Sequence, residues 1–126
     1  MTVPGEVLTP FNVAQMLSNY RIRFVDEIEF QDGIAMALRD HSIGHQREYR
    51  LTPHDRLDFF LTEEAIALEV KIKGRAAEVL RQLERYAAHA DVSGLVLVTT
   101  RRLQAVQMPE RINGKPLAVA CIGGGL

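Results

Sequence analysis

The strongest constraint on the fold comes from three consecutive segments in the middle of the chain. In residues 65–73, apolar side chains occupy every second position, which is typical of a β-strand with one buried face. Residues 75–90 repeat apolar side chains at intervals of three and four, which indicates an amphipathic helix. Residues 94–100 form a mostly apolar run, as in a strand buried on both faces. This order forms a β-α-β crossover, so the two strands should run parallel.

The segments before this crossover predict a helix and two further strands. Residues 24–39 carry apolar residues at helical spacing, and acidic residues crowd their first half, where the helix dipole favours negative charge. Residues 45–51 and 55–61 have the length and composition of strands, and the connections between the three strands are short enough for antiparallel hairpins. The side chains expected to share one face of the second strand are Leu57, Phe59 and Leu61.

The complete order predicts an α/β fold of helix, three-strand meander, helix and strand. A short helix over residues 11–17 should precede it, and residues 117–122 could add an edge strand. The chain has 126 residues, of which 47% are hydrophobic and 25% charged, which suits one folded domain with its own core. We therefore expect a lead-in with a short helix over residues 1–23 and a single domain over residues 24–126.

The charge balance and the cysteine content limit which partners and which cellular compartment we expect for the protein. Fifteen basic and sixteen acidic residues leave a net charge of −1, so a nucleic-acid partner would have to be met by a local basic patch. The single cysteine, Cys121, cannot form an intramolecular disulfide. The first residues have neither a basic start nor an apolar run, so we expect no signal peptide, no membrane span and a cytoplasmic location.

Two acidic residues on neighbouring strands suggest a site. A hairpin centred between Glu63 and Glu64 sets Asp58 directly opposite Glu69, with Cβ atoms about 5 Å apart. Two carboxylates so close repel each other unless a cation or a proton lies between them. Lys71 lies on the same strand face as Glu69 and could supply part of the opposite charge. A solvated strand face with weak charge pairing is the alternative interpretation of this pattern.

A divalent metal ion fits this pair of acids. Mg²⁺ is commonly bound through one or two carboxylates together with water and substrate phosphate, and Asp58 and Glu69 match that description. Such a metal lowers the pKa of a bound water and neutralises a phosphodiester oxygen, while the Lys71 ammonium can orient the water or stabilise developing charge. The four histidines and Cys121 lack the spacing of zinc ligands.

The order of these elements resembles the PD-(D/E)xK nuclease superfamily. The resemblance rests on Asp58, Glu69-Val-Lys71, a helix with Gln82 and Tyr86, and the apolar strand at residues 95–98. The Gln-x-x-x-Tyr element is similar to the RecB-like and Holliday-junction-resolvase-like branch. The resemblance implies a restriction-endonuclease-like αβββαβ core, with a central mixed sheet flanked by helices. It also implies a Mg²⁺- or Mn²⁺-dependent nuclease that hydrolyses DNA phosphodiester bonds, as in phage or bacterial repair and recombination.

The resemblance also assigns roles to single residues. Asp58 and Glu69 would bind the metal together with the backbone carbonyl of Val70, and Lys71 would be the catalytic lysine. The resemblance implies that Gln82 and Tyr86 border the active site and help position DNA, with a helix–sheet boundary pair as the alternative interpretation. Arg101 and Arg102, just beyond the apolar strand, could contact phosphate or merely solvate the end of that strand.

A further acid is expected from the helix over residues 24–39. Glu27 is the first choice because it shares a face with the apolar residues of that helix, and Glu29 is the rival. The chain departs from the superfamily pattern because Leu57, not proline, precedes Asp58, so Asp55 could take part of the role given to Asp58.

Two other functions stay open at this point. One is a non-catalytic nucleic-acid-binding or protein-interaction module that keeps the nuclease fold, and the other is an unrelated α/β interaction protein, which the near-neutral net charge favours. The sequence does not distinguish DNA from RNA, or branched from linear substrates. Small nucleases of this kind are often dimers, so a homodimer is one expectation.

Overall fold

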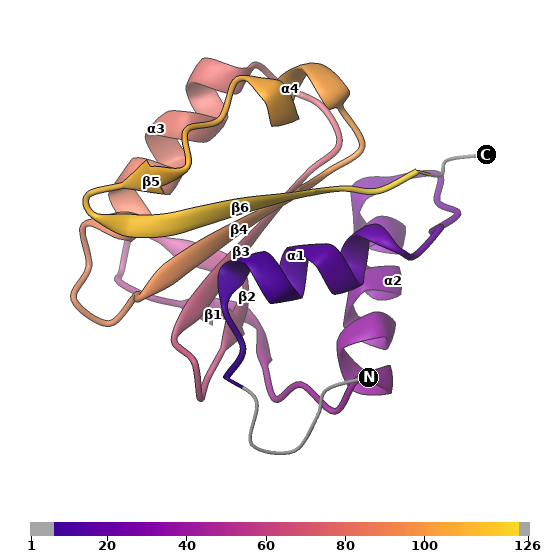
Figure 1. The fold of residues 1–126 in the computed structure, drawn as a ribbon, viewed down its shortest axis with the longest axis horizontal. Coiled ribbons are helices and arrows are strands. Elements are labelled where there is room, and N and C mark those ends of the chain that lie inside the picture. The colour runs from indigo at the N-terminus through magenta and orange to yellow at the C-terminus, as the bar shows by residue number, and fades with distance from the viewer. Residues whose placement is uncertain (1–6, 124–126) are drawn as a thin grey trace.

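The computed structural model describes residues 7–123, so residues 1–6 of the predicted lead-in lie outside it. The helices are α1 (Pro10–Ser18), α2 (Glu27–Asp40), α3 (Ala76–Ala87) and α4 (Arg102–Val106). The strands are β1 (Gln46–Arg50), β2 (Arg56–Leu61), β3 (Ile66–Lys71), β4 (Gly94–Thr99), β5 (Arg111–Ile112) and β6 (Lys115–Cys121). Figure 1 shows one twisted sheet with helices on both faces, which confirms the α/β class.

The six strands form one mixed sheet in the order β1-β2-β3-β4-β6-β5. β1, β2 and β3 form the expected antiparallel meander, and β3 and β4 run parallel, as the crossover through α3 requires. β6 is parallel to β4, and the short β5 is antiparallel to β6. The strand predicted at residues 117–122 is β6, which begins two residues earlier, and β5 pairs only with those two residues, Lys115 and Pro116.

The sheet separates two apolar cores. One core lies under α1 and α2, and the other lies under α3 (Figure 1). β4 is buried along its whole length, as its apolar run predicted. α3 buries Val79, Leu83, Tyr86 and Ala87 against the sheet. These two layers cover the sheet on both sides, so most side chains of β2 and β3 are buried.

The hairpin register between β2 and β3 agrees with the sequence, but the faces of β2 do not. Phe59 pairs with Leu68, as expected for a turn centred between Glu63 and Glu64. Phe59 and Leu61 enter the core under α1 and α2, whereas Leu57 enters the core under α3. The prediction that all three share a face was therefore wrong.

The reason is a break in the regular pleat at Asp58. The pairs Arg47↔Phe59 and Tyr49↔Leu57 leave Glu48 opposite Asp58, and Glu48 has a φ of 55°. This left-handed conformation is incompatible with an extended strand, so the pleat of the β1–β2 pair is interrupted there. Asp58 consequently lies between a residue of β2 that packs into one core, Leu57, and a residue that packs into the other, Phe59.

Local capping explains where α2 begins. Asp26 accepts a hydrogen bond from the Glu29 amide at 2.9 Å, and the Glu29 carboxylate accepts one from the Val25 amide at 2.9 Å. These bonds satisfy amides at the helix N-terminus, so the helix starts at Glu27 and not at residue 24. Within residues 7–123, no helix is long and apolar enough to cross a membrane.

Candidate active site

The three predicted residues on β2 and β3 lie close together. The Asp58 carboxylate accepts a hydrogen bond from the Val70 amide at 2.7 Å, which ties it to the backbone beside Glu69. Lys71 Nζ lies 3.5 Å from Glu69 Oε2. The three side chains therefore lie close together, although the β2–β3 ladder ends one pair before Asp58 and Glu69, at Phe59 and Leu68.

Glu69 is a buried carboxylate with incomplete partners. Its side chain is only 3% exposed, and its Oε1 atom has no hydrogen-bond donor among the residues that the structure describes. A buried charged oxygen without a partner costs free energy, and such a group calls for a specific explanation. A cation or a proton at Oε1 would supply the missing interaction.

Burial and mutual repulsion perturb both acids. Burial, followed by repulsion from the Asp58 charge, raises the pKa of Glu69 to about 8 against the opposing effect of Lys71. Burial also raises the pKa of Asp58, while the Val70 amide holds it down and the Glu27 charge raises it again. A divalent cation bound by the pair would reverse these effects, because it favours the ionised form of both carboxylates.

The geometry separates the roles of the two rival acids on α2. Glu29 is engaged in the cap with the Val25 amide, whereas the charge of Glu27 acts on Asp58. α2 is held against β1 by an ion pair of 2.7 Å between Arg47 and Asp32. Of the two rivals, Glu27 is therefore the one whose charge raises the pKa of Asp58.

The cluster offers two carboxylates as close ligands. In the described part of the chain, no three His, Cys, Asp or Glu side chains lie close enough to hold a metal ion together. A site with two acids fits Mg²⁺, which keeps several waters when it binds to proteins. The amide and carbonyl of a strand residue point to the same side, so the Val70 carbonyl lies on the side of β3 that faces β2, as its amide does.

Gln82 and Tyr86, both on α3, are joined by a hydrogen bond. Gln82 Nε2 donates to the Tyr86 hydroxyl at 2.7 Å, and this hydroxyl donates to the Arg56 carbonyl at 3.2 Å. Tyr86 is 1% exposed, and burial together with the Glu69 charge raises its pKa. Tyr86 therefore borders the site from inside the protein, and Gln82 is the member of the pair that is partly exposed to solvent.

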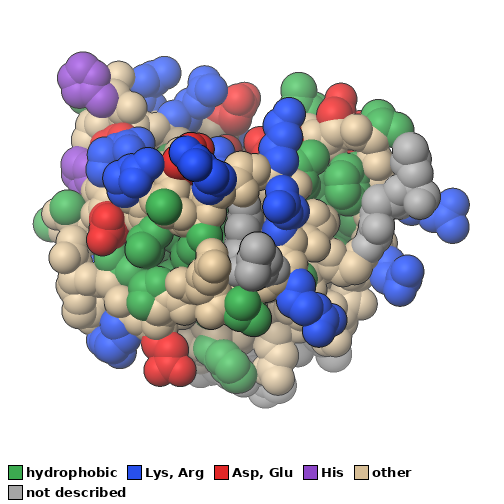
Figure 2. Space-filling model, turned by 90° about the horizontal axis from the view of Figure 1, so that it is seen from above, with side chains coloured by type: hydrophobic (Ala, Val, Ile, Leu, Met, Phe, Trp, Pro, Cys, Tyr) green, Lys and Arg blue, Asp and Glu red, His purple; other side chains and the backbone are tan. Residues whose placement is uncertain are grey.

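Arg101 and Arg102 follow the end of β4 and are exposed. Because Lys71 pairs with Thr99 in the parallel ladder, both arginines lie at the same end of the sheet as Lys71. Figure 2 looks onto the face covered by α3 and α4, where Lys and Arg side chains form a broken band. The exposed basic residues of this part of the chain are Lys73, Arg75, Arg81, Arg85, Arg101 and Arg102.

Asp55 lies outside this cluster. Its carboxylate lies 3.1 Å from Arg85, in the last turn of α3, and 3.6 Å from His89, just after this helix. The sequence had left Asp55 as an alternative to Asp58 and did not reveal this ion pair, because its partners lie about thirty residues away along the chain. Asp58 is thus the β2 acid that lies next to Glu69.

Compared with known proteins, the chain matches no protein-family model, no curated protein and no solved structure. Function is therefore inferred from the residues and the geometry of this chain.

Proposed function

We propose that this protein is a metal-dependent nuclease of the PD-(D/E)xK type that hydrolyses phosphodiester bonds in DNA. One observation carries the proposal: Glu69 is buried with an unpartnered Oε1, beside Asp58 and 3.5 Å from Lys71. A merely structural Glu69–Lys71 pair would not account for a second carboxylate at the same place, since burying two repelling acids destabilises the fold.

The proposed metal ligands are Asp58, Glu69 and the Val70 carbonyl, with Mg²⁺ or Mn²⁺ as the ion. When bound, the ion would lower the pKa of a water and neutralise charge on the scissile phosphate. Lys71 contributes a positive charge that keeps Glu69 oriented, and its side chain is 29% exposed, so it can also reach a phosphate oxygen or an attacking water. Glu27 would act through water, because it lies outside the set of direct ligands.

Two further features support a nucleic-acid substrate. The order α2, β1, β2, β3, α3, β4 is the order expected for the restriction-endonuclease-like core. The exposed Arg101 and Arg102 lie at the Lys71 end of the sheet, and arginine suits phosphate because its planar fork donates two parallel hydrogen bonds. The net charge of −1 makes such a local patch necessary.

The test is a cleavage assay with purified protein on single-stranded, linear duplex and branched DNA, and on RNA, each with Mg²⁺, Mn²⁺ or EDTA. We expect metal-dependent cleavage of DNA, which Asp58→Asn and Glu69→Gln abolish. Lys71→Met should also lose most activity, whereas Lys73→Met, two residues further along the same segment and exposed, is the matched control and should stay active.

Two results would count against the proposal. Metal-independent cleavage, or cleavage that survives in Asp58→Asn, would remove the assigned site. Tight DNA binding without any cleavage under all metal conditions would favour the non-catalytic binding module.

A further inference from the structure

Lysine and arginine gather at the end of the sheet where β2 begins and where β1, β3 and β4 finish. The strand ends and connections there are residues 50–56, 71–75 and 99–102. Their Lys and Arg residues are Arg50, Arg56, Lys71, Lys73, Arg75, Arg101 and Arg102, and the acid among them is Asp55. The residues that lead into β1, β3 and β4 at the other end, 41–45, 62–65 and 91–93, contain Glu63, Glu64 and Asp91 and no Lys or Arg.

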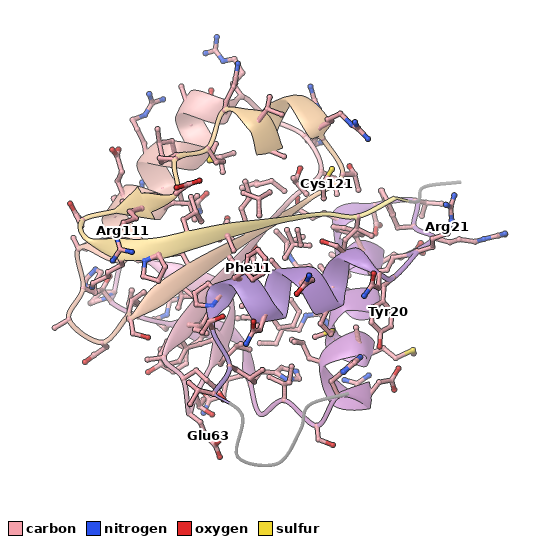
Figure 3. All side chains as sticks on the ribbon, in the orientation of Figure 1. Phe11, Tyr20, Arg21, Glu63, Arg111 and Cys121 are labelled. Atoms are coloured by element: carbon pink, nitrogen blue, oxygen red, sulfur yellow. The ribbon has the colours of Figure 1, made fainter. Side chains whose placement is uncertain are left out.

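Charge is therefore divided between the two ends of these strands. Figure 3 shows Glu63 at the tip of the β2–β3 turn, far from α3 and α4, the helices over which Figure 2 shows the band of Lys and Arg. A chain with a net charge of −1 can attract a polyanion at such a basic end, because the local field and not the total charge acts at short range.

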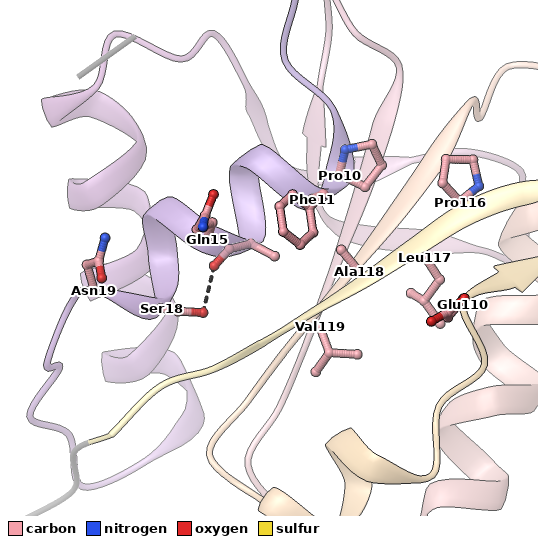
Figure 4. A pocket seen from close by; sticks show the side chains of 11 residues that line it. Pro10, Phe11, Gln15, Ser18, Asn19, Glu110, Pro116, Leu117, Ala118 and Val119 are labelled. Carbon is pink, nitrogen blue, oxygen red and sulfur yellow. Dashed lines mark hydrogen bonds between the residues drawn. The ribbon is translucent and has the colours of Figure 1, made fainter.

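The groove between α1 and β6 is a different kind of surface. Its volume is about 520 Å³, and its lining includes Phe11, Leu117 and Val119 (Figure 4). Among its described lining residues, the charged one is Glu110. Because this lining has no cation for phosphate, we expect a nucleic-acid strand to follow the basic strand ends instead.

Two pairs of arginines flank the acids of the site in the order of the sheet. Arg50 and Arg56 are cross-strand partners, at the end of β1 and the start of β2. Arg101 and Arg102 follow the end of β4. Since the strand order is β1-β2-β3-β4, the acids on β2 and β3 lie between the two pairs.

Arg56 is joined to the site through its backbone. Its carbonyl accepts a hydrogen bond from the Tyr86 hydroxyl at 3.2 Å. Its side chain is 56% exposed and lies 3.9 Å from the carboxylate of Glu48, the residue opposite Asp58. Both side chains of this ion pair are mostly exposed, so it restrains the Arg56 guanidinium only weakly.

Arg50 is exposed beside Arg56. It donates to the Pro53 carbonyl at 3.1 Å, which uses one of the five donors of a guanidinium. The acid of the same connection, Asp55, is already paired with Arg85 at 3.1 Å. The Arg50 guanidinium therefore has donors left for a phosphate.

The width of the sheet between the two arginine pairs suits several phosphates. Neighbouring strands lie about 4.8 Å apart, so β1 to β4 spans roughly 14 Å. Phosphates of one DNA strand follow each other at about 3.4 Å along the duplex axis, so this span corresponds to about four of them. A strand that crosses from Arg50 to Arg101 therefore has phosphates on both sides of the acids.

We propose that Arg50 and Arg56 bind the DNA backbone on the β1 side of the acids while Arg101 and Arg102 bind it on the β4 side, so that the bond that is cut lies within the strand. This inference rests on the proposed nuclease function and adds the path of the DNA across the site. Removing nucleotides from an end needs backbone contacts on one side of the cut bond, whereas contacts on both sides hold a strand that continues in both directions. Arg50 and Arg56 are thus positioning residues.

DNA without ends tests the internal cut. The closed substrates are a single-stranded circle, a duplex circle and a four-way junction with hairpin-closed arms, each beside an open counterpart with free ends, in Mg²⁺ or Mn²⁺. We expect closed and open forms of the preferred substrate to be cleaved at similar rates. Cleavage confined to open forms would overturn this inference and leave the nuclease proposal standing, whereas no cleavage of any DNA would overturn both.

The two arginines are tested by DNA binding in the Glu69→Gln background, in EDTA, with labelled single-stranded and duplex DNA. Arg50→Gln and Arg56→Gln should each lower the affinity about tenfold and reduce the slope of log affinity against log salt by about 0.9. Arg56→Lys should retain the slope. Arg39→Gln, on an exposed arginine in the last turn of α2, is the matched control and should bind as the background protein does.

An unchanged salt slope in both glutamine variants would overturn the assignment of Arg50 and Arg56. Tyr86 bonds to the main-chain carbonyl of Arg56, so this hydrogen bond survives replacement of the side chain. Far-UV circular dichroism and thermal unfolding of each variant separate a lost phosphate contact from a lost fold.

Discussion

Removing the charge of Glu69 should stabilise the metal-free protein at alkaline pH. The pKa of Glu69 is about 8 in the folded protein, against an ordinary value of 4.5. Between these two values the unfolded chain has released the proton and the folded chain retains it, so the free energy of unfolding falls as pH rises. Below pH 4.5 or well above pH 8 both states carry the same charge, and this contribution levels off. Asp58, whose pKa is also raised, acts in the same direction.

The magnitude follows from the size of the pKa difference. At about 1.36 kcal/mol per pKa unit, the difference would amount to roughly 5 kcal/mol if nothing relaxed. Water entry and side-chain movement reduce such penalties, so we expect a loss of about 2 to 3 kcal/mol between pH 5 and pH 9. Glu69→Gln keeps the shape of the side chain and removes its titration, so most of this loss should disappear.

The assay is urea unfolding in EDTA at several pH values. Because the chain has no tryptophan, far-UV circular dichroism is the suitable probe. Glu63→Gln, on an exposed residue of the β2–β3 turn, is the control and should keep the wild-type pH dependence. A wild-type stability that is flat or rises from pH 5 to pH 8 would refute the reasoning, and so would an equal slope in Glu69→Gln.

The remaining predictions concern the metal, the lysine and the residues around them. A hundredfold excess of Mn²⁺ over its dissociation constant should stabilise wild-type protein by about 2.7 kcal/mol in thermal unfolding, and Glu69→Gln should lose this effect. Lys71→Ala should still bind Mn²⁺ in calorimetry but cleave DNA about a hundredfold more slowly or worse; wild-type cleavage by this variant would remove Lys71 from the mechanism. Tyr86→Phe should lower stability by about 1 kcal/mol and reduce kcat more than it affects Mn²⁺ affinity, because Gln82 loses its hydrogen-bond acceptor. Asp55→Asn should lower stability by about 1 kcal/mol and leave cleavage at low temperature unchanged, whereas a selective loss of activity would show that Asp55 belongs to the site.

Much of the fold could be predicted because its signals are local. The alternation in β3, the helical repeat in α3 and the apolar run of β4 each depend on neighbouring residues, and together they required a parallel pair. The hairpin centre predicted the register that brings Asp58 to Glu69. Periodicity is a reliable guide where a segment is regular and packs on one defined core.

The parts that could not be predicted depend on distant contacts or on irregular backbone. The left-handed Glu48 changes the faces of β2, and nothing in its immediate sequence, such as a glycine, marks that conformation. The Asp55–Arg85 ion pair joins residues thirty positions apart.

The reversal of β2 at Asp58 has a consequence for how the protein tolerates mutation. On one side of Asp58, Leu57 belongs to the core beneath α3, and on the other side Phe59 belongs to the core beneath α1 and α2. The position of the Asp58 backbone therefore depends on the packing of both cores. Sequence drift in either layer is transmitted to the same carboxylate, so the two cores cannot evolve independently while the site is under selection.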